Sequence, residues 1–109
     1  MTLEHPIQQQ IRIACSRGPI RLWRNNVGAL RDEHGRLVRY GLCPGSADLI
    51  GLQCLPSGLG RFVALEVKRP GGRLSDAQAA WLAVVEQMGG LAGVVRSVEE
   101  AEALLRGAP

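Results

Sequence analysis

Three residues of this chain have the side chains and the spacing that metal-assisted hydrolysis requires. Glu66 and Lys68 stand two positions apart in the apolar run 62–68, and Asp48 lies in the earlier run 47–52. Alternate side chains of a strand share a face, so Glu66 and Lys68 are predicted neighbours. If the two runs pair through the glycine-rich turn between them, Asp48 comes close to Glu66. Two carboxylates and a carbonyl suit Mg²⁺, and the amine could orient or deprotonate a water.

A simpler interpretation is an exposed Glu66–Lys68 ion pair on an amphipathic strand, with Asp48 as a turn residue. A bare E-x-K triplet usually reflects that arrangement. Two observations favour a catalytic role for these residues instead. The chain has twelve arginines and Lys68 is its only lysine, and a suitably placed lysine can release a proton near neutral pH whereas arginine cannot. The flanking residues are also apolar enough for a central strand, where an unpaired charge is expensive and a ligand offsets that cost.

The hydrophobic pattern predicts one α/β domain over residues 1–109, with the order α, three or four β, α, β, α. The predicted elements are a helix over 4–16, strands over 20–24, 29–31, 37–40, 47–52, 62–68 and 91–96, a helix between 75 and 89, and a last helix from 97. Ser75 and Gln78 form a capping-box sequence at the start of the second helix. Its predicted buried stripe comprises Ala77, Ala80, Trp81, Val84, Val85 and Met88. Trp23 is either a packed aromatic or a stacking platform for a base, and we predict that both tryptophans lie in the core.

Composition excludes several classes of protein. The apolar fraction of 46% and charged fraction of 21% are those of an ordinary globular domain. No apolar run approaches the ~20 residues of a membrane span, and the N-terminus lacks a secretory signal, so we expect a cytoplasmic protein. Three cysteines without C-x-x-C spacing indicate neither a disulfide framework nor a zinc site. The net charge is +3, and residues 1–40 hold seven of the arginines, as a contact with nucleic-acid phosphates would require.

The same residues resemble a known family. The segments that carry the resemblance are 45–50 (GSADLI), 66–68 (EVK) and 72–75 (GRLS), together with Gln78. They are similar to the PD-(D/E)xK nuclease superfamily and, more narrowly, to its virus-type replication-repair nuclease family, VRR-NUC. Further similarity lies at Glu4 with Ile7-Gln8, over 23–28 (WRNNVG), and from the strand after Gly90 to the last helix. Ala47 stands where the superfamily name has proline.

The resemblance implies a fold, a reaction and residue roles. The implied fold is an αβββαβ core plus a C-terminal helix, with a mixed sheet flanked by helices. Asp48 and Glu66 would be metal-binding carboxylates, the Val67 carbonyl a further ligand, Lys68 the residue acting on water, Gln78 a helper, and Glu4 a further acid. The implied cofactor is Mg²⁺, which Mn²⁺ can replace. The implied protein is a bacterial or phage-encoded homodimeric endonuclease that cuts branched or junction DNA in replication and repair.

Several alternatives stay open. Gln78 could serve the capping box alone, and Asn25 and Asn26 could close a strand rather than contact DNA. The predicted DNA-contacting residues are Arg24, Asn25, Asn26, Arg69 and Arg73. The rival functions are a restriction-type or exonucleolytic nuclease, a non-catalytic DNA-binding subunit with the same fold, and a basic scaffold that binds no nucleic acid.

Overall fold

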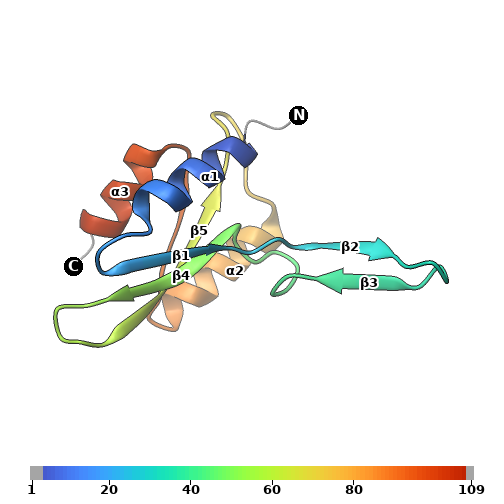
Figure 1. Cartoon of the computed structure of the whole chain (residues 1–109), viewed down its shortest axis with the longest axis horizontal. Coiled ribbons are helices and arrows are strands. Elements are labelled where there is room, and N and C mark those ends of the chain that lie inside the picture. Colours follow the sequence, from blue (N-terminus) through green and yellow to red (C-terminus); the bar gives the residue numbers. More distant parts are fainter. Residues whose placement is uncertain (1–3, 108–109) are drawn as a thin grey trace.

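The structure is a computed structural model that describes residues 4–107 (Figure 1). Its elements are α1 (Glu4–Cys15), β1 (Ile20–Arg24), β2 (Gly28–Arg31), β3 (Leu37–Tyr40), β4 (Leu49–Cys54), β5 (Gly60–Val67), α2 (Asp76–Gln87), β6 (Leu91–Val95) and α3 (Val98–Gly107). Every segment predicted to be a helix or a strand is present, with ends shifted by a residue or two, but five strands precede α2 instead of the three or four in the predicted order. None of these described helices is long and apolar enough to cross a membrane. All three cysteines are free.

Four strands form the central sheet, in the order β1-β4-β5-β6. β1, β4 and β5 pair antiparallel, and β6 joins β5 in parallel after the α2 crossover. α1 and α3 pack together on one face of the sheet and α2 covers the other (Figure 1). The predicted mixed sheet flanked by helices is therefore confirmed, with β2 and β3 inserted into the αβββαβ order.

Two apolar clusters attach the helices to the sheet. The cluster under α1 and α3 contains Ile11, Cys15, Ile20, Leu22, Leu49, Val63, Leu65, Val67, Val95, Ala101 and Leu105. The smaller cluster under α2 contains Ala47, Ala64, Leu82, Val85 and Ala92. Alternate residues of β5 thus enter opposite clusters, because successive side chains of a strand point to opposite faces. Glu66 lies on the same face of β5 as Ala64, the face that α2 covers.

β2 and β3 form a separate antiparallel hairpin that projects from the body (Figure 1). It lengthens the molecule to 50 × 28 × 25 Å. Its apolar side chains are largely in solvent, with Leu30 65% and Leu37 50% exposed. A lone two-stranded hairpin is only marginally stable in water.

The predicted buried stripe of α2 is confirmed at Val85 and is wrong at four of its other positions. Val84 is 54% and Met88 82% exposed, and Ala77 and Ala80 are also exposed, whereas Leu82 and Val85 are buried. Trp81 is half-buried against the smaller cluster. The helix is rotated so that Gln78 faces the sheet, where it bonds to Glu66. The polar residue Gln78 therefore lies on the face of α2 that packs against the sheet, where the apolar spacing predicted only apolar side chains.

The prediction that Trp23 lies in the core is also wrong, because its side chain is 53% exposed. Ile20 and Leu22 of β1 enter the cluster under α1 and α3, which turns Trp23 to the opposite face. β1 is an edge strand and α2 packs mainly over β5 and β6. Trp23 consequently has no helix above it.

Gly51 is expected to be intolerant of a side chain. A Cβ at this position in β4 would overlap the backbone oxygen of Arg21 on β1, and neither strand can move without breaking the pairing. Gly51→Ala should lower the free energy of unfolding by about 2 kcal/mol or more, as overpacking does. Gly60→Ala is the matched control, because nothing lies within 4 Å of its Cβ. Equal urea midpoints for the two variants would contradict the close approach of β1 and β4.

Candidate active site

Asp48 and Glu66 meet at one end of the central sheet. Leu49 pairs with Leu65 across β4 and β5, so the residues that follow in register, Asp48 and Glu66, lie opposite each other. The strand predicted over 47–52 begins at Leu49, so Asp48 directly precedes it, in the bend before Leu49. Its Oδ2 accepts a hydrogen bond of 2.8 Å from the Val67 N–H, which fixes the carboxylate next to the end of β5.

Asn25 holds the segment that leads to Asp48. Its side-chain amide donates to Ser46 Oγ at 2.7 Å and to the Ala47 carbonyl at 2.9 Å, and its side-chain oxygen accepts from the Leu42 N–H at 3.0 Å. Its backbone N–H donates to the Asp48 carbonyl at 2.7 Å. The side chain is buried, so the prediction of a DNA contact from Asn25 is not supported. Asn25 is a positioning residue for Asp48.

Glu66 is a buried carboxyl group with an open acceptor. Only 2% of the residue is exposed, and Oε2 has no hydrogen-bond partner. The pKa of Glu66 is raised to about 8, chiefly by burial and in addition by the neighbouring Asp48 carboxylate, while the Lys68 cation opposes the shift. Two carboxylates that share a dry site cannot both ionise cheaply unless a cation joins them. The donor set therefore fits a hard divalent cation.

Lys68 follows β5 on the same side as Glu66 and is half-buried. Its backbone N–H donates to the Val95 carbonyl at 3.1 Å, which anchors the residue to the end of β6. Within residues 4–107 its ammonium group makes no hydrogen bond or ion pair. The cation is thus near enough to Glu66 to lower that group's pKa, yet is not bound to it.

Gln78 joins the helix cap to the carboxylates. Its side-chain oxygen accepts from the Ser75 N–H at 2.9 Å, and its own N–H donates to Ser75 Oγ at 3.1 Å, which completes the predicted capping box. Its side-chain nitrogen donates to Glu66 Oε1 at 3.2 Å. The capping role of Gln78 is therefore confirmed, and its side-chain nitrogen is free to bond to Glu66 at the same time, so a role in catalysis stays a prediction.

Glu4 lies at the margin of the site. Its Oε2 accepts a 3.3 Å hydrogen bond from the Arg69 N–H, and its charge is the smallest of the causes that raise the pKa of Glu66. In the described part of the chain, no three His, Cys, Asp or Glu side chains gather closely enough to hold a metal ion. The structure thus brings Asp48 and Glu66 together and does not join Glu4 to them as a third ligand.

A polar hollow of about 270 Å³ opens beside Asp48. Arg24, Asn26, Gln8 and Gln78 are among its lining residues. The predicted DNA-contacting residues Arg24, Asn26, Arg69 and Arg73 are all exposed, as a contact with nucleic acid requires. Gln8 was named from the sequence only as part of the family resemblance, and no role was assigned to it. Its signal was the spacing of Glu4, Gln8 and Arg12, which puts three polar side chains on one face of α1.

One comparison with known proteins gives a match. The family model described as the VRR-NUC domain matches residues 4–99, nearly the whole chain. No curated protein and no solved structure shows a significant match.

Proposed function

The chain belongs to the VRR-NUC family of PD-(D/E)xK-type nucleases, and we propose that it is a metal-dependent DNA endonuclease whose site is Asp48, Glu66 and Lys68. The observation that carries this proposal is the buried Glu66 carboxyl, with an unpartnered oxygen beside a second carboxylate. Such a group is costly to keep in a fold unless a ligand uses it. The neighbouring polar hollow gives a phosphate group access to Asp48.

We assign each residue a separate task. Asp48, Glu66 and the Val67 carbonyl would hold Mg²⁺ or Mn²⁺, which when bound acidifies water and neutralises charge on phosphorus-bound oxygens. The Val67 peptide is fixed for this purpose because its N–H is bound to Asp48. Lys68 orients the attacking water or takes its proton, and its charge faces the oxyanion that develops. Gln78 holds Glu66 in place through Oε1, and Glu4 contributes negative charge at the edge.

Branched or junction DNA is the proposed substrate and a homodimer the proposed active form. The projecting hairpin supports a dimer, since Leu30 and Val38 face each other in register on one exposed face. A dimer related by two-fold symmetry would present two sites to one branched molecule. A monomeric mass by light scattering at the concentration used for cleavage would rule out this assembly.

The test of the proposed function is cleavage of labelled duplex, single-stranded, flap and four-way-junction DNA, with Mg²⁺, Mn²⁺ or chelator present. We expect metal-dependent internal cuts that are fastest on a branched substrate. Cuts confined to ends, or to one sequence in linear duplex, would instead establish the exonucleolytic or restriction-type alternative. Salt-sensitive binding without any cutting would establish a DNA-binding subunit.

The two roles of Gln78 can be separated with Ser75 as the control. Ser75→Ala removes the capping hydrogen bond alone, whereas Gln78→Ala also frees Glu66. Each variant should lose about 1 kcal/mol of stability with its cap. Only Gln78→Ala should also lose about tenfold or more in cleavage rate, as losses of groups that orient metal ligands do. Equal single-turnover rates for the two variants would limit Gln78 to capping.

A further inference from the structure

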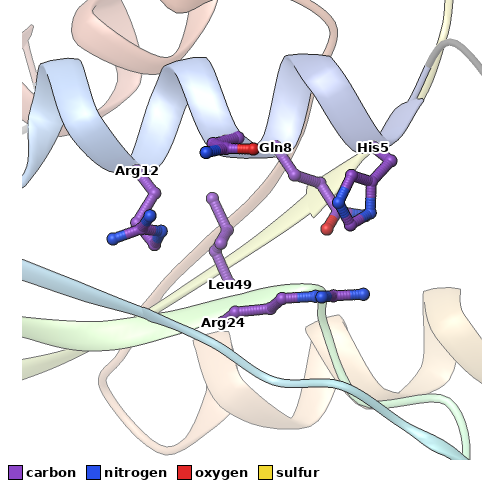
Figure 2. Close-up of a pocket in the computed structure, with 6 residues that line it drawn as sticks. His5, Gln8, Arg12, Arg24 and Leu49 are labelled. Atoms are coloured by element: carbon purple, nitrogen blue, oxygen red, sulfur yellow. The ribbon is translucent and has the colours of Figure 1, made fainter.

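A second hollow lies between α1 and the sheet, next to the carboxylates but separate from them. Its volume is about 220 Å³, and it is lined by His5, Gln8, Gln9, Arg12, Arg24 and Leu49. Figure 2 shows Arg12 reaching down from α1 and Arg24 lying along the opposite wall, with Leu49 rising between them from β4. We call it the α1–β1 groove.

The chemistry of this groove suits an anion. Two of its lining side chains are guanidinium groups, three others carry hydrogen-bond donors or acceptors, and none is a carboxylate. Arg12 is half-buried, and within residues 4–107 its guanidinium group has no hydrogen-bond or ion-pair partner. Arg24 bonds only weakly, at 3.4 Å, to Asn26. Two forked donors without a carboxylate partner favour the oxygens of a phosphate group.

The groove is continuous with the hollow beside Asp48. Gln8 and Arg24 line both spaces, and Leu49, at the floor of the groove, directly follows Asp48 in the chain. Arg24 is the last residue of the edge strand β1, so the passage leads round the end of that strand. A DNA strand whose scissile phosphate lies at Asp48 would therefore place another of its phosphates between α1 and β1.

We infer that the α1–β1 groove is a second phosphate subsite, in which Arg12 and Arg24 bind a phosphate of the DNA strand other than the one being cut. This inference rests on the proposed function. The phosphate is either an internal phosphodiester next to the cleaved bond or the terminal monophosphate of a strand end, and both offer the same oxygens to the guanidinium groups. In either case the subsite fixes where the strand lies relative to Asp48.

The experiment measures binding in chelator, where no cutting occurs, so that it does not depend on catalysis. Fluorescence anisotropy of labelled single-stranded and flap DNA is recorded across a salt series for wild type, Arg12→Gln, Arg24→Gln and Arg21→Gln. Arg21 is the matched control, since it lies on the same strand, is exposed and points its guanidinium at the Gly18 and Ile20 carbonyls. Arg12→Gln and Arg24→Gln should each weaken binding about tenfold and reduce the salt slope by about one. Arg21→Gln should stay within about twofold of wild type.

The two sources of phosphate are distinguished on the DNA. One arm replaces single internal phosphates with neutral methylphosphonates along the strand. If the groove binds an internal phosphodiester, the replacement at one position of the DNA should weaken binding by wild type but not by Arg12→Gln. The other arm compares phosphorylated with unphosphorylated ends, and a preference lost in Arg12→Gln would identify a terminal phosphate.

Each outcome bears on one proposal. If Arg12→Gln and Arg24→Gln match Arg21→Gln in affinity and salt slope, the subsite is overturned even if the wild type cuts DNA. If both variants bind weakly but the wild type never cuts with any metal, the subsite stands and the nuclease proposal falls. Arg24 is exposed, so its variant keeps the test decisive should Arg12→Gln fold poorly.

Discussion

Lys68→Ala should slow metal-dependent DNA cleavage by about 10²- to 10⁴-fold, the usual contribution of a positioned acid or base. Within residues 4–107 the ammonium group makes no hydrogen bond or ion pair, so its loss removes only its electrostatic attraction to Glu66 and the fold should persist. Lys68→Arg separates the two possible roles. Arginine keeps the charge but does not release a proton near neutral pH. If Lys68→Arg is inactive, Lys68 acts as the base. If Lys68→Arg keeps most of the cleavage activity, Lys68 acts by stabilising the developing negative charge.

Asp48→Asn should be at least as damaging, because it removes charge from the proposed metal site while its oxygen can still accept the Val67 N–H. Asp76→Asn is the matched control, since Asp76 is an exposed carboxylate in the first turn of α2. The single-turnover cleavage rate and its dependence on Mg²⁺ concentration are measured for both variants. Full activity in Asp48→Asn at ordinary Mg²⁺ would remove Asp48 from the site.

Local sequence rules predicted the fold well because its signals are local. The capping box at Ser75 begins α2, the turn after Arg31 forms the hairpin, and alternation in β5 turns Glu66 away from Leu65. The errors came from tertiary context. Apolar spacing put Met88 inside, whereas the bond between Gln78 and Glu66 accompanies a different rotation of the helix. Composition alone could not reveal such a contact.

The candidate site was predictable in part, for the same reason. Glu66 lies in β5 and Lys68 directly follows that strand, and the pairing of β4 with β5 brings Asp48 to Glu66. Glu4 and Asn25 could not be placed this way, because their positions depend on how α1 and the 42–47 segment pack on the sheet. The structure leaves Glu4 at the margin and makes Asn25 a buried support. The α1–β1 groove needed both elements in place before it could be recognised.

Glu66→Gln should make the metal-free protein more stable at high pH. Burial, with Asp48 beside it, raises the pKa of Glu66 from the ordinary 4.5 to about 8. Between these two pH values the folded chain holds a proton that the unfolded chain has released. The free energy of unfolding should therefore fall as the pH rises from about 5 to 8, by an amount on the order of 3 to 4 kcal/mol. Glutamine mimics the protonated form and should abolish this slope.

Urea unfolding in chelator at pH 5, 6.5 and 8 measures the effect, with Glu86→Gln as the control because Glu86 is exposed on α2. That variant should follow wild type. Equal pH slopes in wild type and Glu66→Gln would contradict a raised pKa. A divalent cation that binds the ionised pair must displace the same proton, so added Mg²⁺ should stabilise wild type more at pH 8 than at pH 6. In Glu66→Gln this pH dependence should disappear, because no proton remains for the metal to displace.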